Sequence, residues 1–409
     1  MKSFDAMLAS YAEVTVNLGL NIQKGQVLVI DAPILSADFV RIVAEKAYDA
    51  GAKHVEVNWH DAFLGKTRLL RSSIEALSEY PSWRVESYMR MAQEGAAFLT
   101  VHAPQPKLLQ DVPTERITAS TRAARQALSE YQKMRQSFRV AWSIVNYPTL
   151  EWAEQVYPDA APKERLERLW TAIFRMTRVD QNDPAATWQN HLHSLNTRIR
   201  HLNQVQYRRL RYQAPGTDLV VALPENHVWL GGGTTNEQGI FFVPNIPTEE
   251  VFTAPIRTGV NGTVRSTKPL FYNGKLIDDF SLRFENGRIV DYDAAVGYDV
   301  LQSIIETDEG SHYLGELALV PQSSPIAQED TIFYNTGFDE NASCHLAIGM
   351  AYPANISGGT TMSREALLER GVNTSLVHID FMIGSSELDI DGETQDGEWV
   401  PVFRKGEWV

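Results

Sequence analysis

Residues 27–59 read VLVIDAPILSADFVRIVAEKAYDAGAKHVEVNW, and this stretch decides the fold of the first half of the chain. The short apolar run 27–31 predicts a strand, the pattern over 38–50 predicts an amphipathic helix, and 54–59 predicts a second strand. A strand, a helix and another strand in this order form a unit with two parallel strands. The sequence therefore predicts an α/β fold at this point, and the neighbouring segments extend it.

The same alternation continues along the chain. Residues 97–101 (AFLTV) and 140–145 predict two further strands, and a long helix is expected over 113–136. We expect a parallel sheet with helices on both faces. Sheets of this kind often bind dinucleotides, but the segment DAPILSAD after the first strand lacks the glycine fingerprint that such binding requires. The dinucleotide hypothesis is therefore rejected.

The texture of the sequence changes in its second half. Residues 149–210 are expected to be helical, and from Tyr212 onward short alternating strands are separated by turns such as APGT and ENGR. A chain of 409 residues is also too long for one ordinary hydrophobic core. We expect an α/β N-terminal domain over 1–205, followed by an α+β metal-binding catalytic domain over 206–409.

Composition excludes several classes of protein. The formal net charge of -14 argues against a protein that binds the phosphate backbone of a nucleic acid. No stretch approaches the ~18 apolar residues that cross a bilayer, and the N-terminus has no apolar signal core. The single cysteine, Cys344, excludes an internal disulfide framework and fits a reducing compartment. We expect a cytoplasmic protein with neither a nucleic-acid nor a membrane partner.

Two segments, FDENASCHLAIGMAY (338–352) and VHIDFMIGSSELDIDG (377–392), concentrate potential metal ligands. His345 and His378 lie there among carboxylates, a ligand type that suits a hydrolytic Zn, Co or Mn centre better than a structural zinc site. The alternative is two buried, hydrogen-bonded histidines, but so many potential ligands in two short segments favour a metal site. A nucleophilic pair of Cys344 and His345 is rejected because adjacent side chains point in different directions.

Local periodicity predicts how some of these side chains are presented. In a strand over 376–381 (LVHIDF), His378 and Asp380 project from the same face. The segment HLAIGMAY is expected to form a helix that begins at His345. Tyr352 then lies on the same helix face two turns later. Tyr352 is a candidate ligand or hydrogen-bond donor to an anionic transition state, against the alternative of a core tyrosine.

Further carboxylates are selected by their neighbourhoods. Glu316 begins an apolar run, where a charge is costly to bury unless it is paired or bound to metal. Glu250 borders a similar run, and on these grounds Glu249 is an equal candidate. Asp339 and Glu340 precede the first histidine in an expected loop, where either can ligate metal, orient the imidazole or act as a base.

The number of candidates bears on the number of metal ions. A catalytic zinc usually takes three protein ligands and a water. Five mostly hard ligands fit two cations about 3.5–4 Å apart that share a carboxylate. Such a pair can activate a water, polarise a carbonyl and anchor a neutral amine, which are the requirements of amide hydrolysis at an amino terminus. The five candidates are Glu250, Glu316, His345, His378 and Asp380.

At these residues the chain resembles the thermophilic-type metallo-aminopeptidases, the family of aminopeptidase T, aminopeptidase S and PepS. The resemblance rests on NIPTEEVFTAP, GELALVPQSSPI, FDENASCHLAIGMAY and VHIDFMIGSSELDIDG, in the order and spacing of the family. It extends to YQAPGTDLVVALPENHVW, STKPL and NWHD, and so runs essentially from end to end. The visible departure is Cys344, where small or polar residues serve the family as well.

The resemblance implies a cytosolic, homodimeric exopeptidase that binds two divalent ions, Zn, Co or Mn, in a catalytic C-terminal domain. Motif by motif it assigns the five candidates as ligands and selects Glu250 over Glu249. From the five-ligand set we expect two ions to activate a water for attack on the first peptide carbonyl. Glu340 or Glu316 then moves the proton to the leaving amine, and Tyr352 stabilises the oxyanion.

Two rival functions fit the same ligand set. A dinuclear metal amidase or deacetylase would act on non-peptide amides, and it would not require a free amino terminus on its substrate. A metal-stabilised binding protein would hold the ions without turnover. An aminopeptidase is expected to bind peptides with a free amino terminus and to ignore blocked ones.

Overall fold

The computed structural model describes residues 2–272 and 275–409, which form two compact units. Unit 1 comprises the residues up to Gln189 together with Gly233–Pro247, and unit 2 comprises Asn190–Gly232 and Thr248–Val409. Helix α10 (Pro184–Val205) contributes residues to both units. A domain boundary near residue 205 stays a prediction.

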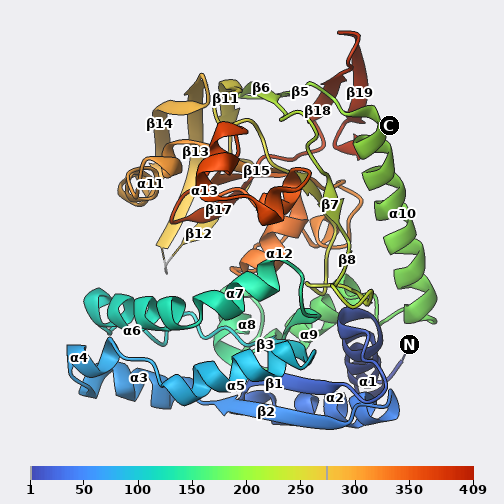
Figure 1. Cartoon of the computed structure of the whole chain (residues 1–409), viewed down its shortest axis with the longest axis vertical. Helices are drawn as coiled ribbons and strands as arrows, with labels where there is room; N and C mark the ends of the chain where they lie inside the picture. Colours follow the sequence, from blue (N-terminus) through green and yellow to red (C-terminus); the bar gives the residue numbers. More distant parts are fainter. Residues whose placement is uncertain (1, 273–274) are drawn as a thin grey trace. The chain divides into compact units, whose positions relative to one another are not determined.

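Unit 1 is built on a parallel sheet of four strands with the order β2-β1-β3-β4. The expected parallel α/β sheet is therefore confirmed, and its first strands and helices are drawn in blue in Figure 1. The strands are β1 (Val27–Pro33), β2 (His54–His60), β3 (Ala97–His102) and β4 (Trp142–Asn146). A short pair, β8 (Thr234–Thr235) and β9 (Phe241–Phe242), also belongs to this unit.

Helices pack on both faces of this sheet. Val29 and Phe98 share a cluster with residues of α5 and α7, including Tyr131. On the other face lies the π-helix Thr15–Leu20, which continues α1. Its Gly19 is so close to Ser143 of β4 that an added Cβ would be 2.9 Å from the hydroxyl oxygen. The helices are α1 (Phe4–Val14), α2 (Ala37–Asp49), α3 (Ala62–Arg71), α4 (Ile74–Leu77), α5 (Ser82–Gln93), α6 (Thr114–Ala127), α7 (Ser129–Gln136), α8 (Leu150–Val156) and α9 (Pro162–Met176). The helix expected over 113–136 is thus two helices, with a break at Leu128.

The larger sheet of unit 2 runs β12-β13-β11-β6-β5-β18-β19-β20, with β14 paired to β13. Its pairs are antiparallel, as the alternating strands and short turns of the sequence predict. The strands are β5 (Arg209–Ala214), β6 (Thr217–Ala222), β11 (Val260–Arg265), β12 (Leu270–Tyr272), β13 (Lys275–Glu285), β14 (Arg288–Val296), β18 (Asp389–Glu393), β19 (Trp399–Arg404) and β20 (Glu407–Trp408). The remaining helices are α11 (Tyr298–Ile305), α12 (Thr336–Asp339) and α13 (Arg364–Glu369).

A second antiparallel sheet of unit 2 carries the segments with potential ligands. Its order is β17-β16-β15-β10-β7. The strands are β7 (Leu230–Gly231), β10 (Val251–Thr253), β15 (Leu314–Leu319), β16 (His345–Gly349) and β17 (His378–Met382). An α/β unit and an α+β unit therefore confirm the expected fold class.

The helix expected over 345–352 is wrong, because residues 345–349 form the strand β16 between β15 and β17. All five residues of β16 are buried. A strand buried on both faces appears in sequence as a continuous apolar run, which periodicity cannot separate from a buried helix. The pairing with both neighbours therefore overrides the local helical pattern.

One face of this sheet is apolar. Leu317, Leu346, Ile348, Ile379 and Phe381 are buried in the main hydrophobic core of unit 2. Side chains alternate between the two faces of a strand, so the residues between these five belong to the opposite face. None of the helices within 2–272 and 275–409 has the length and apolar character needed to cross a membrane.

Candidate metal centre

Three residues form one row across the sheet. Glu316 of β15 lies opposite Ala347 of β16, and Ala347 lies opposite Asp380 of β17. Directly opposed residues of antiparallel strands project from the same face. The carboxylates of Glu316 and Asp380 therefore point to the face away from the apolar core, on either side of a small side chain.

The two histidines project from that same face. His345 lies two residues before Ala347 on β16, and His378 lies two residues before Asp380 on β17. The expectation that His378 and Asp380 share a face is thus confirmed. Glu250 directly precedes β10 and lies two residues before Phe252, so the two side chains project from the same side. Phe252 lies opposite Ala318, which is two residues after Glu316, so this is the face of the carboxylate row.

The structure brings all five sequence-selected residues into two overlapping groups that can each hold a metal ion. In the first group, Nε2 of His345 lies 3.1 Å from Oε2 of Glu250 and 3.6 Å from Oε1 of Glu316. In the second, Nε2 of His378 lies 3.5 Å from Oε2 of Glu316 and 3.4 Å from Oδ1 of Asp380. Glu316 belongs to both groups, and each of its oxygens faces a different histidine.

Backbone carbonyls orient both imidazoles. Nδ1 of His345 lies 3.1 Å from the carbonyl oxygen of Ser343, and Nδ1 of His378 lies 2.6 Å from that of Met350. A carbonyl only accepts, so Nδ1–H is the donor in each ring and the neutral ring keeps its lone pair on Nε2. This is the arrangement typical of metal-ligating histidines.

The carboxylate oxygens also fit a cation. Oε2 of Glu250 and Oδ1 of Asp380 are buried, and apart from the histidine Nε2 atoms beside them they have no partner in the part of the chain that the structure describes. Buried carboxylate oxygens are costly unless they are paired, hydrogen-bonded or bound to metal. Glu316 is 4% exposed and His345 1% exposed, so these groups of the centre are shielded from bulk solvent. The donor set of carboxylates and imidazoles suits a divalent ion such as Zn, Co or Mn.

Without a cation, several groups of the cluster would bind protons near neutral pH. Burial raises the pKa of Glu316 to about 7, although His345 and His378 oppose the shift. Burial would raise the pKa of Asp380, but the nearby His378 lowers it overall. Burial would lower the pKa of both histidines. The neighbouring carboxylates instead raise that of His378 to about 10 and that of His345 well above its ordinary value.

Glu340 and Tyr352 lie at the edge of the five-residue cluster. Glu340 starts a short 3-10 helix, Glu340–Ala342, and burial together with the charges of Glu250 and Asp380 raises its pKa well above the usual range. The ring of Tyr352 contacts that of His378, with centroids 5.1 Å apart. Burial is the main cause that raises the pKa of the Tyr352 hydroxyl, and the nearby carboxylates raise it further. This hydroxyl therefore stays protonated.

The structure separates the alternatives that local sequence left open. Glu250 belongs to a potential metal-binding group, whereas the carboxylate of Glu249 lies 3.7 Å from Nε2 of His191. Asp339, the last residue of α12, accepts hydrogen bonds from backbone N–H groups in the segment before that helix. Burial raises the pKa of the Cys344 thiol to about 11, which is unfavourable for a nucleophile.

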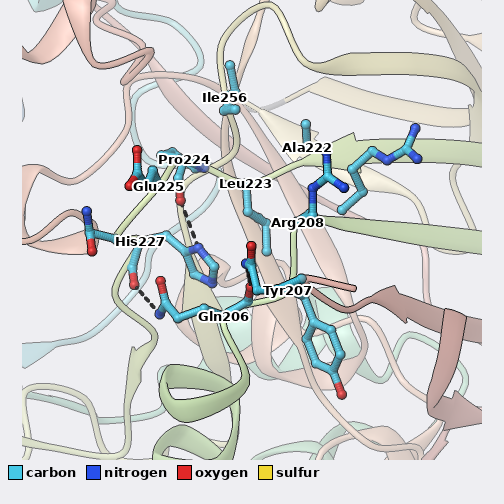
Figure 2. A pocket seen from close by; sticks show the side chains of 12 residues that line it. Gln206, Tyr207, Arg208, Ala222, Leu223, Pro224, Glu225, His227 and Ile256 are labelled. Atoms are coloured by element: carbon cyan, nitrogen blue, oxygen red, sulfur yellow. Dashed lines mark hydrogen bonds between the residues drawn. The ribbon is translucent and has the colours of Figure 1, made fainter. Parts of the chain in front are cut away.

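A cavity of about 580 Å³ lies elsewhere in unit 2, lined by residues including Tyr207, Leu223, His227 and Ile256. Figure 2 shows the imidazole of His227 beside the carbonyl of Pro224, with Nδ1 and the oxygen 2.9 Å apart. None of the five clustered residues is among the described residues that line it. The cavity therefore does not belong to the candidate metal centre.

Sequence reasoning missed several residues that shape the centre. The carbonyls of Ser343 and Met350 carry no sequence signal, because every residue has a carbonyl group. Ala347 and Gly349 become visible only through the register, which places Ala347 between two carboxylates and Gly349 opposite His378. Asn341 is fully buried beside Glu340, but nothing in the local sequence distinguishes it from an exposed asparagine.

A buried sheet face with three carboxylates and two oriented imidazoles is typical of a metal-dependent hydrolase. Comparison with known families makes the class specific. The model of the thermophilic metalloprotease family (M29) matches residues 4–408, and the chain belongs to this family.

Full-length relatives bear aminopeptidase names. The chain is 49% identical to Aminopeptidase 2 of Geobacillus stearothermophilus over 409 residues, which cover 100% of this chain and 99% of the relative. It is 43% identical to Aminopeptidase T of Thermus thermophilus, with 100% of both chains covered. The solved structure of wild-type AmpT from Thermus thermophilus superposes with a TM-score of 0.93 at 42% identity, again over 100% of both chains.

Proposed function

We propose that this chain is a metal-dependent aminopeptidase that removes the N-terminal residue of peptides with the help of two divalent ions. The observation that carries the proposal is the shared position of Glu316, whose two oxygens face His345 and His378 in two separate groups. Membership of a metalloprotease family supports a peptide-hydrolysing role. The aminopeptidase names of the full-length relatives support an exopeptidase.

Two ions account better than one for the composition of the centre. One ion would be held by Glu250, Glu316 and His345, and the other by Glu316, His378 and Asp380. The three carboxylates of these groups, beside two neutral imidazoles, carry more negative charge than one divalent cation balances. Burying such charges without balance is costly, which supports a two-ion centre.

Each chain group has a distinct role in this mechanism. Bound ions would supply a nucleophile from water near neutral pH and polarise the scissile carbonyl. Glu340 holds the proton that leaves the water and passes it to the departing amine, a role that its position at the edge of the cluster supports. Tyr352 donates a hydrogen bond to the oxyanion, since its hydroxyl stays protonated.

We also propose that the chain is a cytoplasmic homodimer that takes Zn, Co or Mn. The buried, unpaired Cys344 fits a reducing compartment, and the ligand set suits each of these ions. Light scattering after size-exclusion chromatography measures the subunit number. A mass equal to one chain at micromolar concentration would contradict the homodimer.

The function is tested by metal removal and substrate blocking together. Chelation is expected to abolish hydrolysis of aminoacyl fluorogenic substrates, and Zn, Co or Mn should restore it with two ions per chain. The same peptide with an acetylated amino terminus should not be cleaved. Equal cleavage of free and acetylated peptides would indicate a general amidase, and metal binding without any turnover would indicate a binding protein.

A further inference from the structure

Asn341 connects the two chain segments that deliver Glu250 and Glu340 to the centre. Its side chain is 0% exposed. Its Oδ1 accepts a hydrogen bond of 2.7 Å from the backbone N–H of Glu249, the residue before Glu250. Its Nδ2 donates to the carbonyl of Gly337 at 3.1 Å and lies 3.5 Å from Oε1 of Glu340.

The contacts use both halves of the amide. A carboxylate could accept from Glu249 but could not donate to Gly337, and an alkyl side chain could do neither. A buried amide with both partners satisfied holds the joined segments in one arrangement. Asn341 therefore fixes the entry to β10 relative to the turn that presents Glu340.

The rest of that turn is anchored independently. The carboxylate of Asp339 accepts hydrogen bonds from the N–H groups of Phe333 at 2.7 Å and Asn335 at 3.0 Å. The Ser324 hydroxyl donates a hydrogen bond of 3.4 Å to the carbonyl oxygen of Asn341. Glu340 thus lies between two residues whose side chains are both tied to the surrounding backbone. Asn341 joins it to the segment before β10, which carries Glu250.

We propose that Asn341 is a positioning residue that holds Glu340 at the working distance from the centre. This inference rests on the proposed function, in which Glu340 carries the proton. A displacement of about 1 Å can lower a rate about 100-fold. The amide contributes to turnover through Glu340 and touches neither substrate nor metal.

The test compares N341D and N341S with E340Q and with the double variant N341D/E340Q. N341D keeps the acceptor for Glu249 and replaces the donor by an oxygen that faces Gly337 and Glu340. N203D is the matched control, because Asn203 likewise accepts from the N–H of Trp229 at 2.8 Å and donates to its carbonyl at 3.0 Å. Turnover, KM, bound metal and thermal midpoint are measured for the metal-loaded enzyme.

We expect N341D to lower kcat about 100-fold while KM and metal content stay within about threefold. N341S, which removes the repulsive oxygen, should recover part of kcat. In the E340Q background, N341D should lower kcat by no more than about twofold, because there is no base left to position. N203D should keep kcat even where its thermal midpoint falls as far as that of N341D.

The outcomes separate the two proposals. If E340Q is slow but N341D adds its full effect on top of it, or if N341D behaves like N203D, the role of Asn341 is wrong while that of Glu340 stands. If E340Q itself keeps normal turnover, the assignment of the base fails, and the positioning role fails with it. A loss of bound metal that accounts for the whole loss of activity in N341D and N341S would also overturn the inference.

Discussion

Glu316 and Asp380 lie in one row of the five-stranded sheet, on either side of Ala347. Adjacent strands are about 4.8 Å apart, so the backbones of the two carboxylates are separated by about 10 Å and their side chains approach over the alanine methyl group. In the proposed centre, a small residue at this point would leave room for an ion held by the two carboxylates. The size of residue 347 therefore limits what the centre can hold.

Replacing Ala347 by leucine is expected to lower bound metal to less than one ion per chain, because the longer side chain fills the space between the carboxylates. Overpacking of a buried site should also cost about 1–3 kcal/mol in the free energy of unfolding. Metal analysis and urea unfolding measure the two effects. Ala153→Leu is the control, since Ala153 is 0% exposed but belongs to α8 of unit 1. Full metal content in A347L would contradict the proposed placement of the ions.

Glu316→Gln should remove both ions, whereas Asp380→Asn should remove mainly the ion shared with His378. The reason is that Glu316 belongs to both potential metal groups and Asp380 to one. We expect kcat/KM to fall by on the order of 100-fold or more in E316Q. Metal stoichiometry at increasing free Zn or Co distinguishes the variants. Full activity with two bound ions in E316Q would rule out a bridging role.

Much of the fold follows from local sequence, and the exceptions have a physical cause. The strands and the helix over residues 27–59 can be predicted because apolar residues recur at different spacings in each. Residues 345–352 have no such period, since β16 is buried on both faces. Its strand state depends on pairing with β15 and β17, which begin about 30 residues before and after it.

The candidate site was only partly readable for the same reason. An H-x-D pattern in a strand already predicts that His378 and Asp380 share a face. The choice of Glu250 over Glu249 needed the family resemblance, because local sequence does not show which parity β10 adopts against β15. The meeting of Glu316 with both histidines is a property of strand order, which arises from contacts between distant segments.

Metal affinity should weaken as the pH falls from about 8 to 6. In the metal-free protein burial raises the pKa of Glu316 to about 7, and Asp380 together with Glu316 raises that of His378 to about 10 against burial. The metal-free site therefore holds protons that binding must release. Calorimetric titration in two buffers of different ionisation enthalpy measures this release. Binding with no proton release at pH 7 would contradict the expectation.

The same shifts set the sign for stability without metal. Because both pKa values are raised in the folded state, the folded chain binds more protons than the unfolded chain between about pH 5 and 9. The free energy of unfolding of the metal-free protein should therefore fall as pH rises through this window. Urea unfolding with and without chelator checks the sign, and the metal-loaded enzyme is the control.

Tyr352→Phe should lower kcat about 100-fold with little change in KM or in metal content. Phenylalanine keeps the ring contacts with Phe252 and His378 but loses the hydroxyl that we assign to the oxyanion. Steady-state kinetics with metal analysis measures the split. Tyr212→Phe is the control, because the Tyr212 hydroxyl is buried without a hydrogen-bond partner among the described residues. Equal kcat in Y352F and Y212F would exclude the hydroxyl from the mechanism.

Gly349→Ala should disturb the ion that we propose at His378 and Asp380 more than the one that we propose at Glu250 and His345. Gly349 has a φ of 107°, and a Cβ there would lie 2.2 Å from the carbonyl oxygen of Val377, the residue before His378. The backbone must therefore shift where β17 presents this histidine. Metal stoichiometry should fall from two ions towards one, with a loss of more than about 1 kcal/mol in unfolding free energy.

Gly397→Ala separates strain from displacement in that experiment. Gly397 has a φ of 85°, and an added Cβ would meet nothing within 4 Å, so its substitution strains the backbone without moving a neighbour. G397A should lose stability and keep two ions. If G349A also kept two ions at the same loss of stability, the contact between Gly349 and Val377 would not position His378. The proposed link between the end of β16 and the second ion would then be wrong.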